Sequence, residues 1–164
     1  MTARVVGATG PVRDPEAVLG RAALWARSQG VEVTLADARS VFGADHAMSA
    51  AIHAVRAMRE KSLSSRTVSM ETLLYLAGQR QVTDAIRVAG IRKDSEAIAI
   101  VIHGDVAPDG LLVELEWSRD DRVLGSEGKS LAVLGTTARE AATVPRDRRP
   151  DLALEKVAVL DVNK

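Results

Sequence analysis

The chain has 164 residues, a formal net charge of zero and no cysteine. These values indicate one domain (residues 1–164) with a sizeable core, and they exclude disulfides, thiolate metal sites and nucleic-acid binding through a strong overall positive charge. No apolar run approaches the roughly 20 residues of a membrane span, and no secretory signal is evident. We therefore expect a cytoplasmic protein with no membrane partner.

The first third of the chain alternates between strand and helix patterns. Short strands are predicted where apolar residues cluster or alternate, and helices where capping residues precede apolar residues at helical spacing. The expected elements are a strand over Arg4–Ala8, a helix from Asp14-Pro15-Glu16 to Gly30, a strand over Val31–Leu35, and an alanine-rich helix capped by Asp45 and reaching about Lys61. Strands interleaved with helices indicate a layered fold.

Two short helical patterns, each closed by a glycine, fill the stretch LLYLAGQRQVTDAIRVAGI from Leu73 to Ile91. Ser69 is the expected N-cap of the first helix, which ends at Gly78. Gly90 ends the second helix, and we expect Ile91 to fold back onto Ile86, as is typical after a glycine-closed helix. The polar triplet Gln79-Arg80-Gln81 then occupies the corner between the helices.

The last part of the chain contains the strongest strand signal. Ala97–Ile102 (AIAIVI) is apolar on both faces and is therefore expected at the centre of a sheet. Pro108–Trp117 is predicted to be a helix, whereas Leu152–Val162 does not choose between the periods of a strand and of a helix. The whole pattern predicts an α+β fold in two layers, with helices packed on a small mixed β-sheet.

The segment Gly7-Ala8-Thr9-Gly10 follows a predicted strand, as the glycine turn of a dinucleotide-binding site does. Arg13 stands where the third glycine of that fingerprint belongs, and Asp37 is the only acid near the end of a second strand. A plain glycine turn is the favoured interpretation. The alternative is a small nucleotide-binding enzyme that uses Gly7–Gly10.

No arrangement of residues indicates catalysis or a metal site. His46 and His53 fall on one helix, but seven residues separate them by about 10.5 Å along the axis, too far for one ion. His103 has no partner at metal spacing, and no nucleophile, base and oxyanion donors assemble. We therefore expect a protein that is not an enzyme, with no catalytic residue, no metal and no cofactor.

Basic residues gather in the middle of the chain, and Arg80 has the most distinctive setting. Its neighbours Gln79 and Gln81 and its place at a corner allow it to present planar donors to phosphates or base edges. Lys61 and Arg66 are further basic candidates nearby in the sequence. The chain has only four aromatic residues, which argues against binding by base stacking.

The block from Glu71 to Ile86, ETLLYLAGQRQVTDAI, resembles the small kinase-binding subunit of the KEOPS complex. The shared pattern is a Glu, an apolar run, a small residue and Gly, then Gln-Arg-Gln-apolar and Ala-Ile. An alanine-rich helix with an early histidine (His46–Lys61) and a terminal segment of the type Leu-Glu-Lys-Val-Ala (Leu154–Leu160) also agree. The resemblance extends over most of the chain and is weakest over Leu111–Val144.

This resemblance implies a compact α+β domain without catalytic activity. Such a subunit binds the small atypical kinase/ATPase of the complex, which works beside the transferase that installs threonylcarbamoyl-adenosine in tRNA. Archaeal members are understood to hold the 3′ CCA end of tRNA, and the length and lack of cysteine suit an archaeal member. An alternative within the family is a scaffold that binds only the kinase.

Carried over by position, the resemblance implies a tRNA contact at the Gln-Arg-Gln corner. The candidates for tRNA binding are Gln79, Arg80, Gln81 and Val82, with Lys61 and Arg66 added from the charge pattern. The terminal segment is expected to form part of the kinase or tRNA surface through Leu154, Val157, Ala158 and Leu160.

Overall fold

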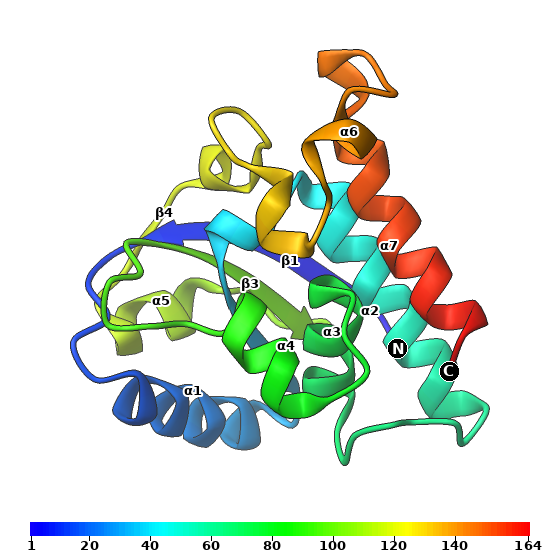
Figure 1. The fold of residues 1–164 in the computed structure, drawn as a ribbon. Coiled ribbons are helices and arrows are strands. Elements are labelled where there is room, and N and C mark those ends of the chain that lie inside the picture. The colour runs from blue at the N-terminus through cyan, green and yellow to red at the C-terminus, as the bar shows by residue number, and fades with distance from the viewer.

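The computed structural model describes residues 1–164 as one sheet surrounded by helices (Figure 1). The four strands are β1 (Ala3–Thr9), β2 (Glu32–Asp37), β3 (Ala97–His103) and β4 (Ser118–Arg119). The helices are α1 (Pro15–Gln29), α2 (Ala44–Arg59), α3 (Val68–Ala77), α4 (Val82–Ala89), α5 (Asp109–Leu115), α6 (Ala138–Ala141) and α7 (Pro150–Val162). Four short 3-10 turns lie at Ala38–Ser40, Asp121–Leu124, Leu131–Leu134 and Arg146–Arg148.

The sheet has the strand order β2-β3-β1-β4, and β3 lies inside it as predicted. Every neighbouring pair is antiparallel, with Val6 opposite Ile100 and Leu35 opposite Ile100 on the other side. The prediction of a mixed sheet was therefore wrong. The α1 crossover does make β1 and β2 run in the same direction, but β3 inserts between them and runs against both.

Helices cover both faces of this sheet, so the fold has three layers, not the two predicted. Alternate residues of β3 point to opposite faces. Ile98, Ile100 and Ile102 are buried against α1 and α5, whereas Ala99 and Val101 are buried on the side of α2 and α3. A strand that is apolar on both faces requires cover on both. The predicted α+β class, with helices packed on a small sheet, is confirmed.

The helix starts follow capping chemistry, although two of the predicted caps were wrong. Asp14 caps α1 as expected, and its side chain accepts a hydrogen bond from the Ala17 amide. Helix α2 begins at Ala44 with Gly43 as its N-cap, two residues before the predicted cap, which places Asp45 inside the first turn. Thr67, not Ser69, caps α3, because its hydroxyl accepts from the Met70 amide at 3.2 Å.

The end of α4 also differs from the prediction. The backbone of Gly90 is extended (φ −67°, ψ 154°) instead of left-handed, so the chain does not fold back onto the helix. Ile86 is consequently 47% exposed. Ile91 instead packs into the core between the sheet, α1 and α5.

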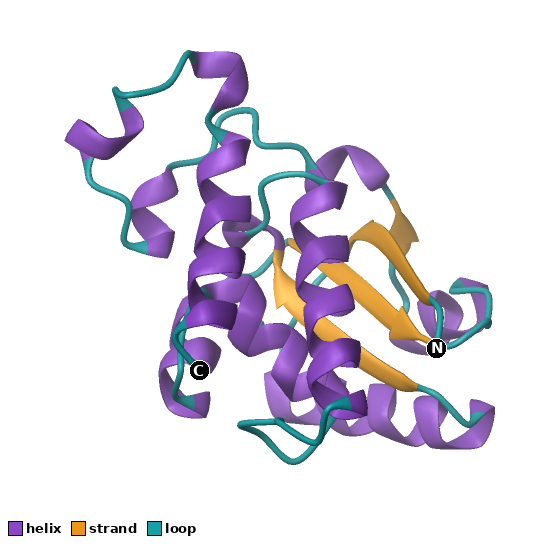
Figure 2. Cartoon of the chain, turned by 90° about the vertical axis from the view of Figure 1, so that its right-hand side faces the viewer, coloured by secondary structure: helices purple, strands orange, loops and turns teal.

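The ambiguous segment near the C-terminus forms the helix α7. It lies alongside α2 in front of the sheet, as Figures 1 and 2 both show. Val157 and Leu160 are buried in the core that α7 shares with α2 and α3. No helix in the structure is long and apolar enough to cross a membrane.

Two buried histidines make the stability of this core depend on pH. The Nδ1 atom of His46 accepts from the Phe42 amide at 3.1 Å, and the Nε2 atom of His103 lies 2.9 Å from the Thr72 hydroxyl. Burial lowers the pKa of both imidazoles to about 4. The folded protein therefore keeps them neutral under conditions in which the unfolded chain binds protons.

We predict that acidification from pH 7 to pH 5 destabilises the fold. The unfolded histidines gain protons below about pH 6.5 and the folded ones do not until about pH 4, so each costs about 2 kcal/mol at pH 5. Urea unfolding at the two pH values measures this loss. His103→Gln should reduce the loss by about half, and an undiminished loss in that variant would contradict the assignment.

Candidate partner and nucleic-acid interface

The predicted corner Gln79-Arg80-Gln81 connects α3 to α4. Helix α3 ends because Gly78 adopts a left-handed conformation (φ 65°), which glycine tolerates at a helix end. Arg80 and Gln81 are exposed, Gln79 and Val82 are half-buried, and Gln81 occupies the N-cap of α4 without a side-chain cap bond. The Arg80 guanidinium donates to the backbone carbonyl of Asn163, just beyond α7.

Lys61 and Arg66 lie just after the C-terminal end of α2. Lys61 has a left-handed backbone (φ 57°), which turns the chain away from the helix axis. Arg66 belongs to the loop 62–67 that leads to α3, and both side chains are exposed. The sequence therefore placed both cations correctly on the surface.

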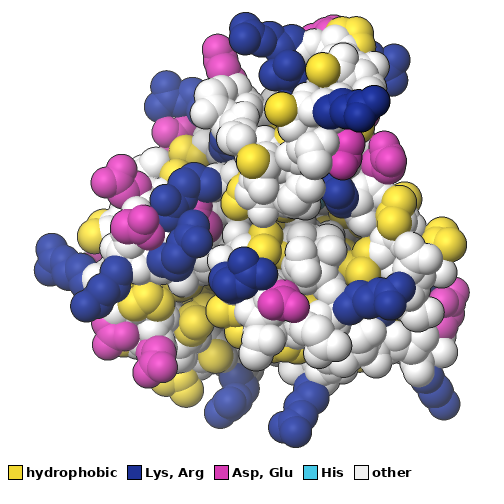
Figure 3. Space-filling view, viewed as in Figure 1, with side chains coloured by type: hydrophobic (Ala, Val, Ile, Leu, Met, Phe, Trp, Pro, Cys, Tyr) yellow, Lys and Arg dark blue, Asp and Glu magenta, His cyan; other side chains and the backbone are white.

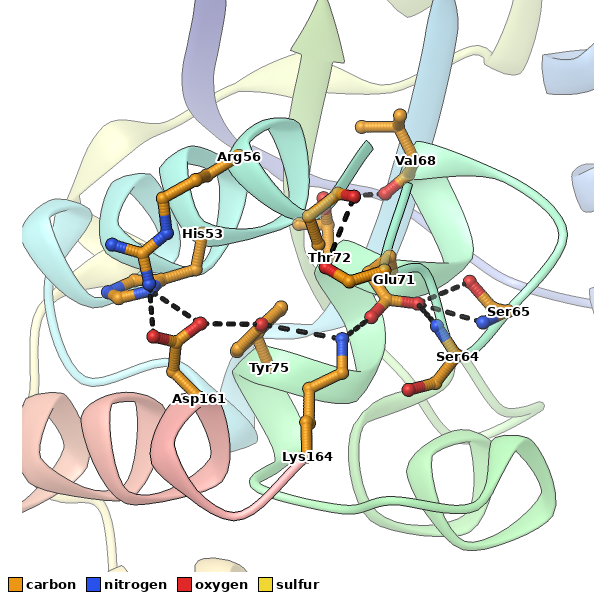
Figure 4. Close-up of polar contacts among 12 residues, drawn as sticks. His53, Arg56, Ser64, Ser65, Val68, Glu71, Thr72, Tyr75, Asp161 and Lys164 are labelled. Carbon is orange, nitrogen blue, oxygen red and sulfur yellow. Dashed lines mark hydrogen bonds and ion pairs between the residues drawn. The ribbon is translucent and has the colours of Figure 1, made fainter. Parts of the chain in front are cut away.

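The loop 62–67 is held by a carboxylate inside the protein. Glu71 on α3 is fully buried, and its Oε2 atom accepts hydrogen bonds from the amides of Ser64 (3.0 Å) and Ser65 (2.9 Å). The Ser65 hydroxyl donates to the same oxygen at 2.7 Å. The ammonium of Lys164 pairs with the other oxygen, Oε1 (Figure 4).

A second carboxylate, Asp161 on α7, joins the neighbouring helices. It accepts from the Tyr75 hydroxyl at 2.8 Å, pairs with Arg56 and lies 3.3 Å from His53 Nδ1 (Figure 4). Burial alone would raise the pKa of Asp161, but hydrogen bonds from Arg56, Tyr75 and His53 outweigh it and lower the pKa. Asp161 thus stays ionised and ties α7 to α2 and α3.

These contacts bring separate parts of the sequence to one end of the molecule. Asn163 contacts the corner and Lys164 contacts the carboxylate that holds the loop 62–67. We call the surface formed by residues 61–67, 79–82 and 161–164 the α7-end surface. It contains all six of the residues predicted to bind tRNA.

The residues predicted on the terminal segment divide between the core and the surface. Val157 is fully buried and Leu160 is 6% exposed, so neither can contact a partner in this conformation. Leu154 is half-buried and Ala158 is exposed. Val159 and Val162, which the sequence reading did not select, are 48% and 82% exposed on the same helix.

The face of the molecule shown in Figure 3 carries both signs of charge. Lys and Arg side chains lie across it and at its edge, with acidic side chains among them. This pattern agrees with the net charge of zero. Any nucleic-acid contact must therefore rely on a few placed cations and hydrogen-bonding groups.

The space beside Gly7 and Gly10, where the nucleotide-binding alternative would place a phosphate, is occupied by other residues of the protein. The Gly7 amide donates to the Asp121 carboxylate at 2.9 Å, and a Cβ on Gly7 would collide with the Asp120 carbonyl. A Cβ on Gly10 would collide with the Trp117 indole. These glycines serve close packing against the segment 117–121. The predicted plain turn was wrong, because Gly7, Ala8 and Thr9 lie within β1 and pair with β3.

Asp37, the acid that a dinucleotide-binding site would need, already forms hydrogen bonds within the protein. Asp37 is 1% exposed and accepts from the Arg39 guanidinium at 2.7 Å and from the Ser95 hydroxyl at 2.5 Å. Burial opposes ionisation, but these hydrogen bonds lower the pKa of Asp37 overall. No group of three or more His, Asp or Glu side chains in the structure is placed to hold a metal ion.

Comparison with models of known protein families identifies the family of this chain. Residues 12–121, more than half of its length, match the model of the family described as kinase binding protein CGI-121. The chain belongs to the CGI-121 family. A search of curated proteins found no match.

The CGI-121 match covers α1 to the start of the Asp121–Leu124 turn and so includes the Gln79-Arg80-Gln81 corner. Helix α7 and the segment before it lie outside the match. The resemblance inferred from the block Glu71–Ile86 is therefore confirmed at the level of the family.

The reading of the sequence missed the buried carboxylate that organises this end of the molecule. It placed Glu71 in the first turn of a helix, where acids are common. One signal was available, because α3 is apolar nearly all round and such a helix is buried on every side. A glutamate within it must find donors inside the protein. The donors from Lys164 lie 93 residues away and carry no local signal.

We predict that Glu71→Gln opens the loop 62–67 and destabilises the CGI-121 domain by about 2–4 kcal/mol. Whichever way the amide of the variant turns, its NH2 group faces donors, either the ammonium of Lys164 or the amides of Ser64 and Ser65, and it offers no charge to Lys164. Urea unfolding measures the loss, and amide hydrogen exchange at Ser64 and Ser65 should accelerate. Glu60→Gln, at an exposed position after α2, is the matched control. A loss below about 0.5 kcal/mol would contradict the role of Glu71.

Proposed function

We propose that this chain is a non-catalytic subunit of the KEOPS tRNA-modification complex that binds the kinase/ATPase subunit and the 3′ CCA end of tRNA. Membership of a kinase-binding family supports the first part. One observation carries the second, namely that the six predicted tRNA-binding residues come together on the α7-end surface. A role in tRNA modification also fits the cytoplasmic location expected from the sequence.

The α7-end surface offers the groups that a single-stranded RNA end needs. Lys61, Arg66 and Arg80 are exposed and form no ion pair with a carboxylate of the chain, so their charge is available to phosphates. Gln79 and Gln81 supply donors and acceptors for base edges, which are accessible in an unpaired end. Val82, half-buried against the core, offers an apolar patch beside them.

We predict that Arg80→Glu weakens tRNA binding by roughly tenfold, about 1.4 kcal/mol, because a phosphate contact is lost and a like charge replaces it. A titration followed by gel shift measures the affinity. The matched control is Arg13→Glu, the same change of charge at an exposed arginine in the loop between β1 and α1. Both variants should melt near the temperature of the parent protein.

The same titration with tRNA lacking its CCA end separates specific from general binding. Trimmed tRNA should bind weakly to the parent protein and should no longer distinguish Arg80→Glu from the parent. Equal affinity of the parent for trimmed and intact tRNA would argue against CCA recognition. Absence of tRNA binding with retained kinase binding would favour the kinase-only scaffold.

For the kinase we propose the outward face of the α2–α7 pair. These helices lie side by side, and they expose the aliphatic residues Ile52 (59%), Val159 and Val162 together with Ala158. Exposed aliphatic side chains on adjacent helices are typical of a surface that binds another protein.

We predict that Ile52→Asp abolishes co-purification of the kinase subunit, because a charge at the centre of an apolar contact is buried without a partner. Leu24→Asp is the matched control, since Leu24 is a 65% exposed aliphatic residue on α1, across the sheet. Loss of the kinase with Leu24→Asp and not with Ile52→Asp would place the contact on α1 instead. Saturable binding of ATP or NAD(P) by the parent chain would revive the nucleotide-binding alternative.

A further inference from the structure

The segment 122–149 lies beyond the family match and builds a pocket that the proposed function does not use. It connects the end of the matched region to α7 and contains two 3-10 turns, the short helix α6 and a further 3-10 turn (Figure 1). Together with Phe42 it lines a half-open pocket of about 1000 Å³. A pocket of this volume accommodates a ligand the size of a nucleotide.

Two polar groups in this pocket are buried without a hydrogen-bond partner. The Thr136 side chain is 96% buried, since only 4% of the residue is exposed, and its hydroxyl has no partner within the protein. The Nε atom of Arg149, just before α7, is also buried and unpartnered. Both residues line the pocket. Buried polar groups are normally satisfied, so a hydroxyl and a guanidinium Nε atom that lack partners in residues lining the same pocket point to a ligand.

The charges around the pocket are suited to an anion. Arg146 and Arg149 line it and form no ion pair within the protein, and Lys129 adds a third cation. Lys129 donates to the carbonyls of Val41 (2.7 Å) and Val123 (2.6 Å), which leaves one of its three donors free. Glu127 and Asp147 are the only acids in the lining. Figure 3 shows the basic side chains that surround this end of the molecule.

The lining also contains apolar and hydroxyl groups that fit the remainder of an organic ligand. Phe42 and Leu131 are buried residues whose side chains line the pocket, and Ala138 and Ala141 come from α6. Serine and threonine hydroxyls lie between these apolar residues.

We propose that the pocket formed by Phe42 and the segment 126–149 binds the phosphate group of a ligand, with Arg146, Arg149 and Thr136 as its donors. Guanidinium groups bind phosphate oxygens through paired hydrogen bonds, and the Thr136 hydroxyl supplies a further one. The phosphate group can belong to a small phosphomonoester or to an RNA backbone, and the test below distinguishes the two.

Isothermal titration of the full chain with AMP, inorganic phosphate and adenosine tests the proposal. AMP and inorganic phosphate should bind saturably, whereas adenosine, which lacks the phosphate, should bind at least tenfold more weakly than AMP. The double variant Arg146→Gln/Arg149→Gln should lose at least tenfold in affinity for AMP. Arg139→Gln is the matched control, because Arg139 lies on α6, is exposed and does not line the pocket.

Thr136→Val provides a readout that does not depend on charge. Replacing a buried, unpartnered hydroxyl by a methyl group should raise the melting temperature of the free protein and lower its affinity for AMP several-fold. A variant that melts higher and binds AMP unchanged would show that Thr136 is no donor to the phosphate. That result, or equal affinities of the arginine double variant and Arg139→Gln, would overturn the proposal.

Competition identifies the source of the phosphate. Displacement of AMP by inorganic phosphate but not by an RNA oligonucleotide without terminal phosphates supports a small phosphomonoester. Displacement by that oligonucleotide supports an RNA backbone, provided that it persists in Arg80→Glu, which separates this pocket from the α7-end surface. Failure of AMP, inorganic phosphate and the oligonucleotide alike to bind at millimolar concentration would refute a phosphate site.

Discussion

The buried carboxylate of Glu71 is the constraint on which the organisation of one end of this protein depends. A charge with no exposure is tolerated only when donors surround it, and here the amides of Ser64 and Ser65 and the ammonium of Lys164 supply them. Satisfying this one charge therefore fixes the loop after α2 and the residues after α7 at the same time. The Gln79-Arg80-Gln81 corner is fixed to the same place through Asn163. A surface assembled from three separate parts of the chain thus depends on a few polar contacts made beneath it.

The elements with local chemistry could be predicted from the sequence, but their arrangement could not. Asp14, Pro15 and Gly30 define α1, and the apolar run in β3 identifies the central strand, because capping and burial act on neighbouring residues. The insertion of β3 between β1 and β2 is a property of the whole chain, and it decides that the sheet is antiparallel. The second helical layer was not predicted, although the same strand signalled it, since residues that are apolar on both faces need cover on both.

For the candidate site too, the sequence predicted what neighbouring residues determine, namely the exposed corner, but not the distant residues that contact it. Gly78 ends α3, so the polar residues after it had to form an exposed corner, and the family pattern gave that corner a meaning. Asn163, which contacts the corner, and Lys164, which pairs with Glu71, lie more than 80 residues from their partners, beyond the reach of any periodicity. Val157 and Leu160 were assigned to the surface because an isolated helix pattern does not reveal which side meets α2. The α7-end surface and the pocket lined by residues 126–149 lie at opposite ends of α7.

Amide hydrogen exchange of the whole chain with and without CCA-ended tRNA tests the assembled surface most directly. If the α7-end surface holds the RNA, residues 61–67, 79–82 and 161–164 will all exchange more slowly in the complex, although they are far apart in the sequence. Unchanged exchange in these three segments under saturating tRNA, with slowing confined to other parts of the chain, would contradict this assignment.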